Sequence, residues 1–367
     1  MKNVKYVKLC ACIVLTALSL ISAAASCKLE SGGFTLLTGD YSAPVLTDFT
    51  LTGENDALMR FSKPVVFSAV QCTRIGQTNT TFSVNTESGE GGTSYILHFI
   101  EAVPVGYDYL LEGRVQDAGG SSLCFSLDFY GYNSRVPATI FSEVGPVHAA
   151  AQDPKKAKAE FAELYILEDG NIGGMIIQSA YDGVLTDFVL PAAEVKAGSY
   201  VSVHMRLFGE KAVSETGDNF ALSTTAYSCN VSRDIWDKKA DSAKTRLGAD
   251  DVLLLRTRSG GALADALLYS RSGKTVWTKP LMSEYAADAF ESGIWIEGTE
   301  PENAVCSDGI TAVRTLSRLN VAELAAAFTS GEKAPFAVSA SDWKVLSGKN
   351  GEKASPGKPN VFAGKVP

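Results

Sequence analysis

Residues 107–129 read YDYLLEGRVQDAGGSSLCFSLDF, two runs of alternating apolar and polar residues separated by the turn residues 117–120. Such alternation is typical of a strand with one buried face, and a glycine-containing turn joins two such strands into an antiparallel hairpin. Similar runs, separated by turn residues, occupy positions 45–51, 57–61, 65–70 and 95–100. Residues 79–93 between them are rich in Thr, Ser and Gly and indicate a mobile hairpin connection. The spacing predicts an antiparallel β sandwich over residues 44–137.

The alternating pattern restarts after a polar junction at residues 131–137. Strands are predicted at 139–144, 161–167, 175–177, 200–205, 252–257 and 263–269. Helices are predicted in three longer connections: one capped by Ser232, one after Ser283 that ends at Gly293, and one with a capping box of Asn320 and Glu323. The helices do not alternate with every strand, which argues against a doubly wound α/β fold. We therefore expect an all-β protein with a second sandwich over residues 138–360 and a short tail at 361–367.

The composition permits a substantial core and disfavours nucleic acid as a partner. Of the 367 residues, 46% are hydrophobic and 20% are charged, and the net charge is −8. Loss of Lys2, Lys5 and Lys8 with a leader would bring the net charge to about −11, which disfavours binding to a phosphate backbone. Only three histidines occur, in unrelated contexts, so we expect neither a zinc site nor histidine-based catalysis.

The N-terminus has the three parts of a secretory signal over residues 1–26. Three lysines precede an apolar run at 9–21, and small residues follow at 22–26. The stretch Ala24-Ala25-Ser26-Cys27 resembles the lipobox of bacterial lipoproteins, which implies that Cys27 becomes the lipidated first residue. The alternatives are ordinary signal cleavage and an uncleaved anchor, although the apolar run is shorter than the ~20 residues that span a bilayer. We expect 27–43 to be the lipidated N-terminus and linker, attached to a membrane by lipid. Because Lys28 stands where an aspartate favours inner-membrane retention, the outer membrane or cell surface is favoured.

Four cysteines remain beyond the leader and Cys27. They are Cys72, Cys124, Cys229 and Cys306, two in each predicted sandwich. An oxidising compartment would permit one disulfide inside each sandwich, Cys72 with Cys124 and Cys229 with Cys306. Four buried free thiols are the alternative, because sequence alone does not establish proximity.

The N-terminal stretch resembles the bacterial immunoglobulin-like domains that recur in cell-surface proteins. The motifs are Phe-Ser-Lys-Pro-Val at 61–65 and the strand at 107–115 that runs into Asp-Ala-Gly-Gly at 117–120. The resemblance implies a spacer or adhesion module without catalytic residues.

The C-terminal portion resembles the lamin tail domain family, whose fold is immunoglobulin-like. The motifs that match in order are IFSEV at 140–144, EFAELY at 160–165, LP at 190–191, KAGSYV at 196–201, ADDVLLL at 249–255, LAD at 263–265, TLSR at 315–318, DW at 342–343 and SPGKPN at 355–360. The resemblance implies two tandem immunoglobulin-like sandwiches. Insertions at 208–247 and 272–313 depart from the family pattern, and we expect any specific activity to reside there.

Acidic residues supply the strongest candidates for chemistry. Glu160 and Glu163 are three positions apart on a predicted strand, so their side chains point to opposite faces and cannot act together. We expect Glu163 to bond to a neighbouring turn or backbone amide. Asp234, Asp237 and Asp241 share a helix face with interleaved lysines, which favours a solvated surface. The oxygen-rich run 301–309 differs in order from a calcium-binding loop, so no metal or other cofactor is expected.

Aromatic residues indicate a possible binding surface. Trp236, Trp277 and Trp295 lie in or near the two insertions, where we expect a partner-binding patch, whereas Trp343 is expected in the core.

The sequence therefore predicts an exported, lipid-anchored, non-enzymatic cell-envelope protein that serves as a binding or structural module, with an unidentified protein or glycan partner. The alternative is an accessory or catalytic component of a secreted hydrolase or nuclease system. A third possibility is an assembly factor that binds its partner by strand addition at a sheet edge.

Overall fold

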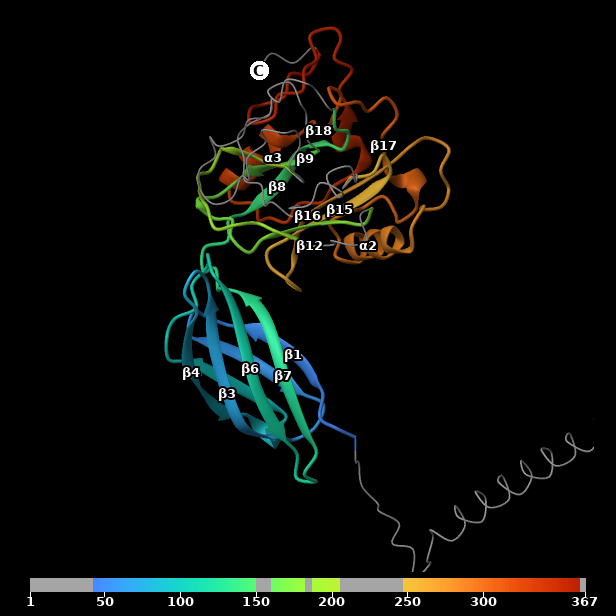
Figure 1. Ribbon diagram of the computed structural model, residues 1–367. Helices are drawn as coiled ribbons and strands as arrows, with labels where there is room; N and C mark the ends of the chain where they lie inside the picture. The colour runs from blue at the N-terminus through green and yellow to red at the C-terminus, as the bar shows by residue number, and fades with distance from the viewer. Residues whose placement is uncertain (1–41, 150–159, 182–186, 205–246, 364–367) are drawn as a thin grey trace, which may run out of the picture. The chain divides into compact units, whose positions relative to one another are not determined.

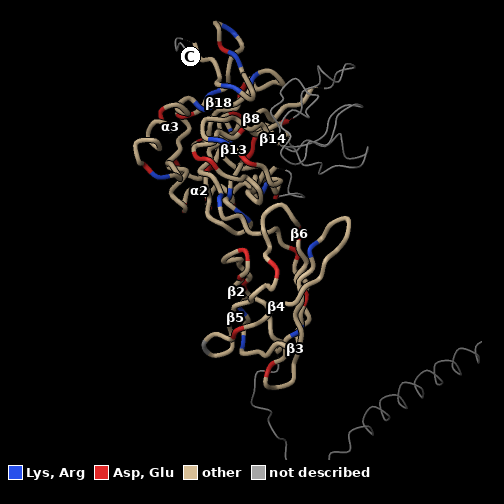
Figure 2. Tube along the Cα trace, turned by 90° about the vertical axis from the view of Figure 1, so that its left-hand side faces the viewer, with Lys and Arg blue, Asp and Glu red and all other residues tan. Residues whose placement is uncertain are grey.

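The structure is a computed structural model that describes residues 42–149, 160–181, 187–204 and 247–363. It confirms an all-β protein with few helices (Figure 1). Lys and Arg are interspersed with Asp and Glu along the described trace (Figure 2).

Residues 46–130 form an antiparallel β sandwich whose strands follow the order β1-β2-β5-β4-β3-β6-β7. The strands are β1 (Leu46–Leu51), β2 (Asp56–Phe61), β3 (Val66–Ile75), β4 (Thr80–Ser88), β5 (Ser94–Phe99), β6 (Asp108–Gln116) and β7 (Ser122–Tyr130). The rings of Phe49 on β1 and Phe129 on β7 lie 5.3 Å apart, so the two edge strands pack into one core.

The hairpin predicted at 107–129 is confirmed as β6 and β7. Their turn is closed by the Asp117 side chain, whose Oδ1 accepts a 2.8 Å hydrogen bond from Ser121 N. The prediction of a mobile connection at 79–93 is wrong, because β4 occupies most of it. Phe82 and Val84 are buried, and the Thr and Ser residues around them suit a strand paired on both sides.

The second part of the chain places two five-stranded sheets around one apolar core. One sheet has the order β12 (Asp187–Val189), β11 (Ile176–Ser179), β15 (Asp251–Arg256), β16 (Leu263–Ser270) and β17 (Val305–Cys306). The other has the order β14 (Tyr200–His204), β9 (Phe161–Ile166), β8 (Thr139–Gly145), β18 (Leu316–Arg318) and β19 (Trp343–Val345). A short pair, β10 (Gly170–Asn171) with β13 (Glu194–Val195), lies outside both sheets.

Among the described residues, two α-helices lie in the connections, and both differ from the prediction in how they begin. Helix α2 (Pro280–Glu291) starts before Ser283, because Pro280 suits the first helical position, and it packs beside β15 and β16 (Figure 1). Helix α3 (Val321–Thr329) follows Asn320, but the predicted capping box is not formed. The Asn320 amide instead donates to Asp342 and accepts from Arg318. Ser232 lies outside the described residues.

Candidate functional site

The central polar feature of the second sandwich is a pair of buried glutamates, Glu143 on β8 and Glu163 on β9. A β-bulge at Ser142 shifts the register so that Glu143 stands directly opposite Glu163. Both side chains are fully buried. Two carboxyl groups from separately predicted strands therefore lie side by side in a buried site.

Hydroxyl and amide groups from four segments surround the pair. Glu163 accepts hydrogen bonds from Ser142 Oγ at 2.8 Å, from Ser202 Oγ at 3.1 Å and from Gly357 N. Glu143 Oε1 accepts a 2.6 Å bond from Thr315 Oγ1. The prediction that Glu163 bonds to a turn amide is confirmed, since Gly357 lies in the C-terminal turn.

That turn comprises residues 355–360, the Ser-Pro-Gly-Lys-Pro-Asn motif, and is called the 355–360 turn below. Lys358 N donates to Ser355 O at 2.9 Å, and Gly357 at φ +80° occupies the left-handed region that a type II turn requires. The Asn360 amide accepts from Ser355 N at 2.6 Å and donates to Ser317 Oγ at 3.1 Å. The turn is thus fixed to strand β18 as well as to Glu163.

Burial dominates the electrostatics of the pair. Burial, and after it the charge of the neighbouring Glu143, raises the pKa of Glu163 from the usual 4.5 to about 8. Burial likewise raises the pKa of Glu143 to about 7, against the opposing effects of Thr315, Asn360 and the Ser355 backbone. Asn360 and Ser355 face Glu143, although neither completes a well-aligned hydrogen bond to Oε2.

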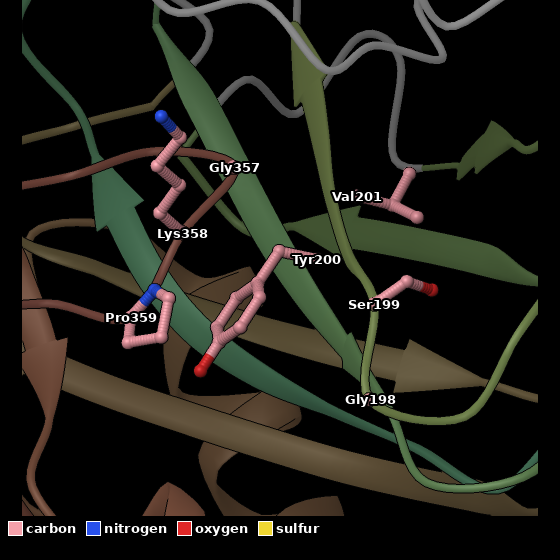
Figure 3. A pocket seen from close by; sticks show the side chains of 7 residues that line it. All are labelled: Gly198, Ser199, Tyr200, Val201, Gly357, Lys358 and Pro359. Carbon is pink, nitrogen blue, oxygen red and sulfur yellow. The ribbon is translucent and has the colours of Figure 1, made fainter.

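A pocket of about 490 Å³ lies beside the 355–360 turn. One wall is Gly198, Ser199, Tyr200 and Val201, and the other is Gly357, Lys358 and Pro359. Figure 3 shows the Tyr200 ring extending from β14 toward Pro359. The Tyr165 and Tyr200 rings meet edge to face, with centroids 4.9 Å apart. The pocket therefore offers an aromatic side chain next to a lysine.

A buried ion pair connects the two sheets. Arg318 Nη1 on β18 lies 2.7 Å from Asp265 Oδ2 on β16, and both side chains are almost completely inaccessible. Asp265 also accepts a 2.7 Å hydrogen bond from Phe141 N, and the Arg318 guanidinium lies 5.6 Å from the Trp343 ring centre. Burial raises the pKa of Asp265 even though Arg318 lowers it, so the loss of hydration outweighs the attraction.

Glu160 has partners different from those of Glu163, which confirms that the two carboxylates do not act together. Glu160 Oε1 lies 3.3 Å from His148 Nδ1, and Glu160 Oε2 accepts a 3.2 Å hydrogen bond from Leu247 N. The next residue along, Phe161, pairs with His204 at the end of β14. Glu160 therefore ties down backbone at one end of the sandwich.

The buried Asp251 has a comparable role. It accepts hydrogen bonds from Ser179 Oγ at 2.7 Å and from the backbone N–H groups of Tyr181, Gly248 and Val252. In the oxygen-rich run 301–309, Asp308 accepts from the Ser272 backbone and hydroxyl. Asp234, Asp237 and Asp241 lie outside the described residues.

The expected tryptophan surface is wrong for two of its three members. Trp295 is 0% exposed and Trp277 is 7% exposed, and both belong to the core, as Trp343 does. The 272–313 insertion uses its apolar residues to pack α2 against the sheet. Trp236 lies outside the described residues.

The predicted Cys72–Cys124 disulfide is also wrong, because both residues are free thiols. On the intervening strand β6, Cys72 pairs with Leu111 and Cys124 pairs with Arg114. These positions are three residues apart, so the two thiols lie on opposite faces. Cys306 is a free, exposed thiol, whereas Cys229 and Cys27 lie outside the described residues.

Alkylation of the native protein should therefore modify Cys124 and Cys306 rapidly and leave Cys72 unmodified until unfolding. Burial raises the pKa of Cys72 to about 12, so almost none of this thiol is in the reactive thiolate form near neutral pH. Peptide mapping by mass spectrometry resolves each cysteine. Rapid labelling of Cys72 in the native state, or a disulfide-linked Cys72–Cys124 peptide, would contradict this expectation.

The sequence motifs contained Glu143, Asp265 and Arg318 without revealing their roles. The available signal was Glu143, the single acidic residue of the predicted strand 139–144, all of whose residues are buried in β8. Among the described helices, none combines the length and apolarity needed to cross a membrane.

Comparison with known proteins found one curated relative and several weak structural likenesses. An uncharacterized protein of Treponema pallidum (strain Nichols) is 26% identical over 214 residues, which are 56% of this chain and 52% of that protein. The chain thus spans about half the length of this curated relative.

Solved structures resemble the chain only at low TM-scores. Domains 1–6 of the surface layer protein SbsC give a TM-score of 0.24 at 14% identity, over 44% of this chain and 32% of that chain. A DUF4876 family protein from Bacteroides thetaiotaomicron VPI-5482 gives 0.28 at 10% identity, over 76% and 86%. These scores carry no argument about function.

A family model matches the second part of the chain. The model named TP_1001_2nd, described as a protein second domain, matches residues 137–345, more than half of the chain and nearly all of the second sandwich. The chain belongs to the TP_1001 second-domain family.

Proposed function

We propose that the protein is an exported, lipid-anchored component of the cell envelope that serves as a binding or structural module, with its sandwiches at the outer membrane or cell surface. The second sandwich, on this proposal, is of lamin-tail type. The basic, apolar and small-residue order of residues 1–26 supports export, and the lipobox-like stretch before Cys27 supports the lipid anchor.

One observation carries the proposal of a non-catalytic module. The buried carboxylates of the second sandwich point inward and hold backbone or strands: Glu163 holds the 355–360 turn, Asp251 holds three backbone amides, and Asp265 joins the two sheets. Groups used in this way serve stability, because moving them towards a substrate would leave buried polar partners unsatisfied. The pocket beside Tyr200 supports a binding role, since an aromatic ring with a polar edge suits a protein or glycan partner.

Metabolic labelling with palmitate tests the anchor. The wild type should incorporate the lipid and fractionate with membranes, whereas Cys27→Ala should not be labelled, because the acylated thiol is gone. Cys12→Ala is the matched control, since this cysteine lies inside the leader and its loss should leave labelling unchanged. Unlabelled wild-type protein in the culture medium would overturn the anchor.

Protease shaving of intact cells, performed on the same cultures, tests the location. Surface exposure predicts loss of the full-length labelled protein while a periplasmic marker survives. Survival of the labelled protein would contradict placement at the cell surface.

A further inference from the structure

Glu143 and Glu163 face each other without a cation between them among the described residues. The groups around them are the Ser142, Ser202 and Thr315 hydroxyls and the Gly357 amide. Another titratable group near the pair is the Tyr200 phenol, whose pKa is raised first by burial and then by the charges of Tyr165 and Glu163. Lys358, on the 355–360 turn itself, lines the pocket. Two adjacent carboxylates in a dry site cannot both be ionised without strong repulsion.

We propose that Glu143 and Glu163 form a proton-dependent latch, which holds the 355–360 turn on the sandwich while the pair retains a proton and releases it when both carboxyl groups are ionised. The turn is held by the Gly357 N–H donated to Glu163 and by the Asn360 amide donated to Ser317 Oγ. The Gly357 bond itself favours the ionised Glu163, so the lost hydration of two buried charges and their mutual repulsion drive the release. Release of the turn admits water to the pair and relieves the repulsion.

The direction of the pH dependence follows from linkage. The closed form binds protons more tightly than the open form, because the pKa values of both glutamates are raised above the usual 4.5 when they are buried. The latch is therefore fully stabilised below about pH 4.5 and loses that stabilisation as the pH rises through about 7 and 8. The turn should be closed in acidic and neutral medium and open in alkaline medium.

The donors around the pair favour a proton over a metal ion. The Gly357 N–H and the Ser142, Ser202 and Thr315 O–H groups point at the carboxylate oxygens, which are the positions that a bound cation would need. No three His, Cys, Asp or Glu side chains form a metal-ligand set in the part of the chain that the structure describes.

Release of the turn would also change the neighbouring pocket. Gly357, Lys358 and Pro359 form one of its two walls, so an open turn leaves Tyr200 and its strand without a facing surface (Figure 3). The loop before the 355–360 turn is held by separate contacts. The Glu352 carboxylate pairs with Lys344 and accepts a 3.0 Å hydrogen bond from Ser347 N. The Lys344 contact lowers the pKa of Glu352 to about 2, so this carboxylate does not titrate in the same range.

Hydrogen exchange measured by mass spectrometry on the full mature chain tests the latch. After correction for the intrinsic pH dependence of exchange, protection of peptides covering 355–361 should fall as the pH rises from about 4.5 to about 8, by up to about tenfold per pH unit for each glutamate, and then level off. Protection of helix α3 should stay constant and serves as the internal reference. Unchanged protection of 355–361 across this range would overturn the proposal.

Two glutamine variants separate the pair from other causes. Glu143→Gln removes the repulsion but retains an oxygen that can accept from Thr315, so the fall in protection of its 355–361 peptides should be smaller than in the wild type, with the burial of Glu163 accounting for the rest. Glu352→Gln, on the same loop but outside the pair, should keep the wild-type fall. The assignment to the pair is refuted if protection of the 355–361 peptides falls as much in Glu143→Gln as in the wild type. It is also refuted if protection no longer falls in Glu352→Gln.

Carbon-13 NMR of glutamate-labelled wild type keeps the test decisive if Glu143→Gln does not fold. Two carboxyl resonances should titrate at about pH 7 and about pH 8, and titration of all glutamates near 4.5 would overturn the proposal. Addition of calcium should not change the protection at alkaline pH. Restored protection would indicate a cation site in place of the latch and would also overturn it.

Discussion

Replacing Asp265 by alanine should lower the free energy of unfolding of the second sandwich by about 3–5 kcal/mol. The change removes the partner of Arg318, which is completely buried and cannot reach water to recover its hydration. It also removes the acceptor for Phe141 N. Urea denaturation monitored by tryptophan fluorescence reports this loss, because all three described tryptophans belong to the second sandwich.

The matched test removes both charges together. Asp265→Leu combined with Arg318→Met should recover most of the lost stability, since apolar side chains of similar size avoid the hydration penalty of the pair. Asp169→Ala breaks an exposed ion pair with Lys196 and should leave the midpoint nearly unchanged. If Asp265→Ala is as stable as the wild type, the claim that it leaves Arg318 buried without a charged partner is wrong.

Trp295→Ala should destabilise the second sandwich by a similar amount, about 3–5 kcal/mol. The indole is fully buried in the core, so truncation loses its contacts and leaves a cavity. Phe290→Ala is the control in the same insertion, because that ring is 46% exposed, and its effect should stay within about 0.5 kcal/mol. Normal stability with impaired partner binding in Trp295→Ala would restore the surface role that the sequence predicted.

Local sequence features were sufficient to predict strands, turns and some partners. The 107–129 hairpin follows from alternation and a glycine turn, and the opposed directions of Glu160 and Glu163 follow from strand geometry. Strand β4 was missed because its two buried apolar residues are surrounded by Thr, Ser and Asn, which also suit loops.

The polar centre of the second sandwich could not be predicted, because it depends on contacts between distant segments. Glu143 meets Glu163 only because of the bulge at Ser142, and the 355–360 turn reaches them from nearly 200 residues further along the chain. The tryptophans were assigned to a surface because their segments matched no known motif, although a large aromatic side chain favours burial wherever an insertion can pack.

The hydrogen bond from Leu247 N to Glu160 has a practical consequence for protein engineering. His204 pairs with Phe161, and Leu247 bonds to the residue before it, so residues 204 and 247 lie at adjacent points of the sandwich. The distance to be bridged is therefore fixed by the sandwich, and the entropy of closing a loop grows only slowly with its length. An epitope tag or fluorescent reporter can accordingly be grafted between these two points with little cost to the sheets.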